Sequence, residues 1–139
     1  MSDENTHADL VELTRGLSEA GDLAATMSFY GADAVYDMSA MGMGVFEGRA
    51  AIRSFLEDWF GAYEEYEDEL QEIRALGNGV VFAVVRQNAH PTGSPVHVRL
   101  RDLYGYVFVW ADRKVARVTP YPDVVEALAA AERLAESRG

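Results

Sequence analysis

The stretch Tyr30-Gly-Ala-Asp-Ala-Val-Tyr-Asp37 runs into a loop rich in glycine and methionine, and then into an amphipathic helix that starts at about Gly48. Its last four residues are predicted to be extended, which puts the Asp37 carboxylate at the end of a short strand. The loop after it is apolar at Met38, Met41, Met43, Val45 and Phe46. A carboxylate bordered by apolar surface is either paired or has a shifted pKa, and shifted carboxylates serve as general bases. Asp37 is therefore the leading candidate for a catalytic base.

Helical periodicity is clearest directly after this loop. Over about 49–64, apolar residues recur at helical spacing and form one face made of Ile52, Phe55, Leu56, Trp59, Phe60 and Tyr63. Upstream, a first helix is predicted to start near Thr6 and to end before Gly21, and Asp22 can cap a second helix that runs to about Tyr30. A terminal helix is predicted from Pro122 to about residue 137.

From residue 66 onward the periodicity becomes that of strands. Strands are predicted over roughly 67–76, 80–90, 96–110 and 114–120, with tight turns at Gly77-Asn-Gly79 and at Asp112-Arg113 and a longer turn between them at 90–95. Hairpin connections of this kind indicate an antiparallel sheet. The sequence thus predicts an α+β fold in which helices cover one face of a curved sheet.

Composition narrows the classes of partner. The chain has 139 residues, a size typical of one domain, with 23 acidic and 12 basic side chains and a net charge of −11. This charge disfavours nucleic acid and anionic membrane surfaces, and no apolar run approaches the roughly 20 residues of a membrane span. Cysteine is absent and the first residues do not look like a secretory signal, so a cytoplasmic protein is expected. The acidic run 64–69 is predicted to be a solvated helix end and edge strand.

The order of these elements over residues 10–121 resembles that of the superfamily of nuclear transport factor 2, ketosteroid isomerase and the SnoaL-like polyketide cyclases. Three short motifs support the resemblance, namely Ala20-Gly-Asp-Leu23, Gly48-Arg-Ala-Ala-Ile-Arg53 and Asp112-Arg-Lys-Val-Ala-Arg117. The resemblance implies one cone-shaped domain over 1–139, with the helices and a strongly curved antiparallel sheet enclosing a pocket. It also implies a homodimer, for which a sheet face with alternating Val and Arg is suited. Such motifs identify the fold better than the activity.

The resemblance implies roles for a few residues. Asp37 matches the general base of the isomerase, whose second acid falls at or near Tyr106 and whose tyrosine falls at Thr14. The base is kept and the oxyanion pair is not, although Tyr106 and Tyr104 can each donate a hydrogen bond. A steroid isomerase is therefore disfavoured, and base-assisted chemistry on another carbonyl compound fits better.

Strand alternation places Asp102 and four aromatic residues on one face of the 96–110 strand, namely Tyr104, Tyr106, Phe108 and Trp110. Such a face suits a cavity wall, because aromatic side chains bury large areas and tyrosine keeps a polar tip for a ligand. The alternative is that these aromatic residues pack against Trp59 and Tyr63 as ordinary core. The predicted ligand contacts, besides Tyr104 and Tyr106, are Thr14, Tyr30, Met41, Trp59, Tyr63 and Asp102.

No cofactor or metal ion is predicted. His90 and His97 flank one loop and His7 lies far away in the sequence, a spacing that matches no zinc motif. The glycines of 42–48 have the spacing G-x-G-x-x-x-G with no Lys-Ser/Thr after them, so they do not form a nucleotide loop.

The leading hypothesis is a protein that binds a small, largely apolar molecule and performs acid/base chemistry on it, with isomerisation, aldol cyclisation and epoxide opening all compatible. The alternative is a non-catalytic module that only binds a ligand or dimerises. The position of Asp37 separates the two hypotheses. A catalytic Asp37 lines a cavity and has a raised pKa, whereas a structural one caps a helix or pairs with Arg49 or Arg53.

Overall fold

The computed structural model of the chain describes residues 7–20, 22–61, 63–91 and 100–138, and the side chains of 63–66, 89–91 and 100–102 fall outside the described part. The elements are α1 (His7–Ser18), α2 (Leu23–Met27), β1 (Tyr30–Asp37), the 3-10 turn η2 (Ser39–Met41), β2 (Val45–Glu47), α3 (Arg49–Gly61), β3 (Tyr63–Gly77), β4 (Val80–Pro91), β5 (Leu100–Ala111), β6 (Lys114–Tyr121) and α4 (Val124–Arg138). Within these residues, no helix has the length and apolar character needed to span a bilayer.

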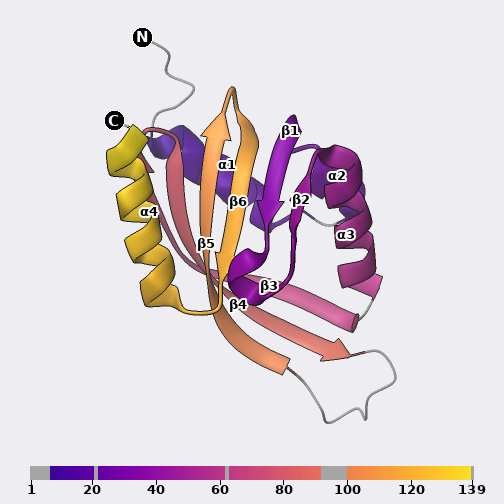
Figure 1. Cartoon of the computed structure of the whole chain (residues 1–139). Coiled ribbons are helices and arrows are strands. Elements are labelled where there is room, and N and C mark those ends of the chain that lie inside the picture. Colours follow the sequence, from indigo (N-terminus) through magenta and orange to yellow (C-terminus); the bar gives the residue numbers. More distant parts are fainter. Residues whose placement is uncertain (1–6, 21, 62, 92–99, 139) are drawn as a thin grey trace.

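The strands form one six-stranded sheet in the order β2-β1-β6-β5-β4-β3. β3 to β6 are antiparallel neighbours in sequence order, whereas β1 lies parallel to β6 and antiparallel to β2. Irregularities in β3, between Leu70 and Glu72 and between Ala75 and Gly77, add local bends to the long edge strand. The sheet curls, with α1, α2 and α3 over its inner face and α4 along its outer face (Figure 1).

The predicted α+β fold class is confirmed, and the four long strands lie where the periodicity places them, except that β3 already begins at Tyr63, which was expected at the end of the preceding helix. The sheet differs from the expected antiparallel meander because it also contains a parallel pair, β1 with β6. Residues 45–47, expected in a loop, form β2 opposite the end of β1, and β1 begins at Tyr30 because α2 already ends at Met27. The parallel pair joins segments that are distant in sequence, which local periodicity does not register, and β2 is only three residues long, too short to show a strand pattern.

Two hairpin turns use left-handed backbone. At Asn78-Gly79 the φ angles are 57° and 82°, and at Asp112-Arg113 they are 52° and 63°. Two successive positive φ angles are typical of the type I′ turn, whose twist matches that of the strands it joins. The tight turns predicted at these positions are therefore present.

The outer face of the sheet has its own small core beneath α4. It consists of Ala127, Ala131 and Ala135 packed on Val80, Phe82, Val84 and Val107. The small alanine side chains let the helix approach closely at Gly105, where an added methyl group would overlap that of Ala127 and lie 3.3 Å from the Val124 Cα. Helix α4 therefore covers part of the sheet face that was expected to form a homodimer. Leu103, which lies on β5 like Gly105, is 42% exposed.

We expect Gly105→Ala to lower the free energy of unfolding by about 1–3 kcal/mol, because the new methyl group has no space beneath α4. The measurement is chemical denaturation followed by circular dichroism. Gly44→Ala is the matched control, because a methyl group there meets nothing within 4 Å. Equal losses of stability in the two variants would contradict the close packing of α4.

Candidate functional site

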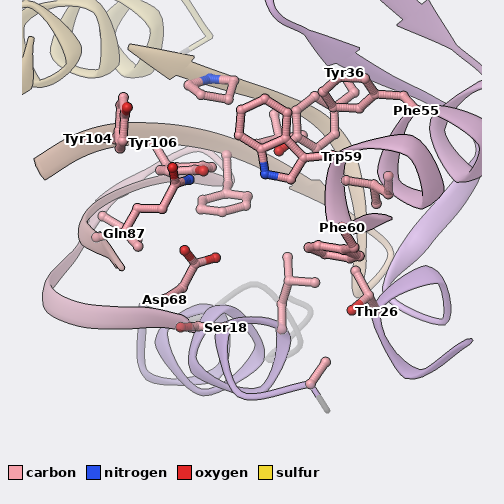
Figure 2. Close-up of a pocket in the computed structure, with 18 of the residues that line it drawn as sticks. Ser18, Thr26, Tyr36, Phe55, Trp59, Phe60, Asp68, Gln87, Tyr104 and Tyr106 are labelled. Carbon is pink, nitrogen blue, oxygen red and sulfur yellow. The ribbon is translucent and has the colours of Figure 1, made fainter. Parts of the chain in front are cut away.

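A cavity of about 910 Å³ lies between α1–α3 and the inner face of the sheet. Residues from every long strand and from the first three helices line it, together with the methionines of the loop after β1. Figure 2 shows its two sides, with Tyr104, Tyr106, Gln87 and Asp68 on the sheet and Phe55, Trp59 and Phe60 on α3. The helices and the sheet together therefore enclose a space large enough for a small molecule.

The sheet wall is built by strand alternation. On β5, Tyr104, Tyr106 and Phe108 all line the cavity, since every second side chain of a strand points to the same face. Asp68 of β3 lies directly opposite Gln87 of β4 in the antiparallel register, and both line the cavity. Gln87 is 7% exposed, so its amide is a buried polar group on this wall, next to the carboxylate of Asp68.

The helix wall is mainly aromatic. Phe55 and Trp59 lie one turn apart on α3 with their ring centroids 6.0 Å apart, and the ring of Tyr36 from β1 is 5.3 Å from that of Phe55. Phe60 follows on the same helix and also lines the cavity. These rings give a ligand a continuous apolar surface with hydroxyl groups at its margin.

Side chains from β1, β3 and β5 form a polar centre in the cavity lining. Tyr36 shares a side-chain hydrogen bond with Tyr106, and the charge of Asp68 acts on the same hydroxyl. Burial, followed by the negative charge of Asp68, raises the pKa of Tyr36 well above its usual value, and the hydrogen bond with Tyr106 offsets part of this effect. Tyr36 therefore remains a neutral hydrogen-bond donor at physiological pH.

Asp37 lies outside this cavity. Tyr36 and Met38 line the cavity, and Asp37 between them points away because alternate side chains of a strand face opposite sides. Its carboxylate accepts hydrogen bonds from the Ser39 backbone N–H at 2.9 Å, from the Ser39 hydroxyl at 2.6 Å and from the Arg117 guanidinium at 2.5 Å. Burial alone would raise the pKa of Asp37, but the bonds from Ser39 and Arg117 outweigh it, and the pKa is lowered.

This arrangement corrects the expectation for Asp37. The predicted base needed a place in the cavity and a raised pKa, and Asp37 has neither. Its partner is Arg117 of β6 and not Arg49 or Arg53, because Arg49 donates to the Met27 carbonyl and Arg53 pairs with Glu57. Asp37 thus fixes the turn after β1 and links β1 to β6.

The other predicted site residues fall into two groups. The cavity lining includes Thr14, Tyr30, Met41, Trp59, Tyr104 and Tyr106. The side chains of Tyr63 and Asp102 lie outside the described part of the chain, as do those of His90 and His97. Thr14 also has a structural contact, because its hydroxyl oxygen accepts a hydrogen bond of 3.1 Å from the indole N–H of Trp110. Whether these residues contact a ligand stays a prediction.

Sequence reasoning missed Tyr36, Asp68 and Gln87. The run 64–69 was expected to be fully solvated, whereas Asp68 lines the cavity between the exposed Glu67 and Glu69. The signal in the sequence was strand alternation: Asp68 lies two residues before the apolar Leu70, so both side chains point to the same face of the sheet. In the described part of the chain, no group of three or more acidic or histidine side chains is arranged to hold a metal ion.

Residues 11–118 match the model of the SnoaL-like domain. The chain therefore belongs to the SnoaL-like family, within the superfamily that includes nuclear transport factor 2. A search of curated proteins returns no match.

Solved structures of the same fold have low sequence identity to this chain. A protein of ketosteroid isomerase-like fold from Catenulispora acidiphila, in complex with trimethylamine, is 15% identical with a TM-score of 0.70, over 91% of this chain and 94% of that one. An LEH-like epoxide hydrolase from M. tuberculosis is 17% identical with a TM-score of 0.69, over 91% and 92%. A candidate polyketide cyclase from Xanthomonas campestris is 23% identical with a TM-score of 0.66, over 86% and 94%. At these identities the likeness shows a shared fold.

We expect Asp37→Asn to lower the free energy of unfolding at pH 7 by about 1–3 kcal/mol, because charged hydrogen bonds to Ser39 and Arg117 are weakened. Since the folded-state pKa of Asp37 is lowered, this stabilisation is complete above the ordinary carboxyl value of 3.8 and is lost as the pH falls through the folded-state pKa. Denaturation curves of both chains, measured from pH 7 down to about pH 2.5, test this pH dependence, because the lowest pH is about one unit below the ordinary carboxyl pKa.

Asp58→Asn, which changes an exposed carboxylate on α3, is the control and should alter the free energy of unfolding by less than about 0.5 kcal/mol. An Asp37→Asn variant as stable as the native chain at pH 7, or a stability difference that grows as the pH falls, would contradict the structural role of this carboxylate.

Proposed function

We propose that this chain binds a small, largely apolar molecule in the cavity between α1–α3 and the sheet. The observation that carries the proposal is the cavity itself, about 910 Å³ in volume, with aromatic walls and a few polar groups directed into it. Ligand sites in proteins typically have volumes of about 300–1,000 Å³ and this combination of walls and convergent polar groups. A cavity of this size inside a 139-residue chain is more than a packing defect.

The arrangement of the walls indicates how the ligand lies. Its apolar part contacts Phe55, Trp59 and Phe60 on α3, and its polar end reaches the sheet near Asp68 and Gln87 (Figure 2). Methionine side chains of the loop after β1, at Met38, Met41 and Met43, complete the lining. Methionine is flexible and polarisable, so this part of the wall can adjust to ligands of different shape.

The solved structures support a binding role. The Catenulispora acidiphila protein, which has the same fold, is in complex with trimethylamine, and the M. tuberculosis protein is named an epoxide hydrolase. Chains of this fold therefore include both ligand-bound proteins and enzymes. Their identities to this chain are below 25%, so the particular molecules are not transferred.

The polar centre favours a second function, which is proton transfer on a carbonyl compound. Asp68 would accept a proton from the carbon next to the carbonyl group, and the electron pair of that C–H bond would move onto the carbonyl oxygen. Tyr36 and Tyr106 share a hydrogen bond, in which one hydroxyl donates to the other, and the remaining O–H of the pair would donate to that oxygen as it becomes negative. Isomerisation and aldol cyclisation both begin with this step, whereas epoxide opening would instead use a proton donor at the oxygen.

The binding proposal is tested with 1-naphthalenemethanol, an uncharged molecule with an apolar ring. We expect it to cause saturable NMR shifts in the methyl groups of the cavity methionines, because these side chains lie in the cavity lining. Leu70→Trp fills part of the cavity and should weaken binding by about tenfold or more. Leu103→Trp, on an exposed position away from the lining, is the matched control and should bind as the native chain does. Shifts that do not saturate, or that Leu70→Trp leaves unchanged, would refute the binding site.

The proton-transfer function is tested with 2-tetralone in deuterium oxide, by following the loss of its acidic C–H signals. We expect exchange above the buffer rate, and we expect Asp68→Asn to reduce the enzymatic part by about 100-fold or more, as is typical for loss of a general base. Asp37→Asn, with its carboxylate outside the cavity, should keep the native exchange rate once the variant is shown to be folded. A reversed result, with Asp37 essential and Asp68 dispensable, would restore the base predicted from the sequence.

A further inference from the structure

The charged side chains that line the cavity are all acidic. They are Asp22, Glu57 and Asp68, and no Lys, Arg or His side chain of the described part of the chain lines it. A cavity for a carboxylate or phosphate normally supplies a cation or several convergent N–H donors to pair with the negative charge. The described lining therefore lacks the groups that an anionic ligand requires.

The three carboxylates are not equivalent. Asp22 is exposed and caps α2, where its carboxylate accepts a hydrogen bond of 2.7 Å from the Ala25 N–H. Glu57 has a side chain that is 54% exposed and pairs with Arg53 at 3.1 Å. Asp68 lies on the sheet wall opposite Gln87, and Figure 2 shows its carboxylate directed into the cavity. Because its carboxylate points into the cavity, Asp68 is the one that we expect a bound molecule to meet.

The wall across from Asp68 suits a positive charge. Figure 2 shows Trp59 and Phe60 of α3 on the far side of the space into which the Asp68 carboxylate points. The faces of aromatic rings attract ammonium groups, with tryptophan the strongest, and the attraction grows when water is excluded. A cation between the two walls would therefore lie near a carboxylate on one side and aromatic rings on the other.

The charge of the whole chain adds to this local arrangement. With a net charge of −11, the protein attracts cations and repels anions at long range, and a concave site concentrates this field. The global charge affects every cation equally, whereas the carboxylate and the aromatic rings select cations that also carry an apolar group.

We propose that the ligand is an organic cation, with a protonated amine or quaternary ammonium group against Asp68 and an apolar ring against the aromatic residues of α3. The proposal rests on the binding function proposed above and specifies the class of ligand. It favours binding over proton transfer, because an ammonium group on Asp68 occupies the carboxylate that would otherwise accept a proton.

The test compares three probes that share one ring system and differ in charge. They are 1-naphthylmethylamine, which is a cation at pH 7, the neutral 1-naphthalenemethanol and the anion 1-naphthoate. We expect the amine to bind about tenfold or more tightly than the alcohol, and the carboxylate to bind at least about tenfold more weakly than the alcohol. Isothermal titration calorimetry or NMR titration of the native chain gives the three dissociation constants.

Variants separate the local carboxylate from the global charge. Asp68→Asn should bring the affinities for amine and alcohol to within about threefold of each other, whereas Asp58→Asn removes the same charge from the surface and should keep the native ratio. Trp59→Leu should weaken the amine more than the alcohol. If Asp68→Asn does not fold, the order of the three affinities on the native chain and the effect of Trp59→Leu still test whether the ligand is a cation.

The outcomes distinguish the two proposals. An alcohol that binds as tightly as the amine, or an amine preference that both Asp68→Asn and Trp59→Leu leave unchanged, overturns the organic cation and leaves the binding function in place. Failure of all three probes to bind in the cavity overturns the binding function itself, and the organic cation with it.

Discussion

The parallel pairing of β1 with β6 is the constraint on which the rest of the structure depends. It places Val35 opposite Arg117 and Tyr36 opposite Val118, and the Asp37–Arg117 ion pair joins the same two strands through side chains 80 positions apart. Because β1 follows α2 and precedes α3, this pairing holds the helical half of the chain over the inner face of the meander. The two halves also pack together where α1 lies against β3 and β4, and the cavity is the space that these contacts leave open.

Much of this arrangement could be predicted from the sequence, where the signal is local. Period-2 alternation placed Tyr104, Tyr106 and Phe108 on one face of a strand. Helical periodicity placed Phe55 and Trp59 on one face of the helix after Gly48. Both faces line the cavity. Asp37 could not be placed, because the direction of a side chain at a strand end depends on the partner strand, and that partner is about 80 residues away. Strand alternation from Leu70 could have placed Asp68 on the cavity face, but the acidic residues on both sides of Asp68 obscured this pattern.

The two aspartates show how one residue type acquires different properties in one fold. Asp37 is surrounded by donors, from Ser39 and Arg117, that stabilise its charged form. Asp68 lies among hydroxyl, amide and aromatic groups on the cavity wall and exerts its charge on Tyr36. The first aspartate is suited to holding strands together, and the second is suited to meeting a bound molecule. The face of the strand on which each aspartate lies therefore decides its environment.

The close approach of α4 to the sheet at Gly105 separates the two faces of β5. Tyr104 and Tyr106 point into the cavity, while Gly105 and Val107 lie under a helix that contacts them through alanine methyl groups. Substitutions that reshape the lining leave the alanine contacts intact, and compensating changes beneath the helix leave the lining intact. Evolution can therefore alter the cavity lining on one side of a strand and restore lost stability on the other, which is one way for a scaffold to persist among structures that share few residues.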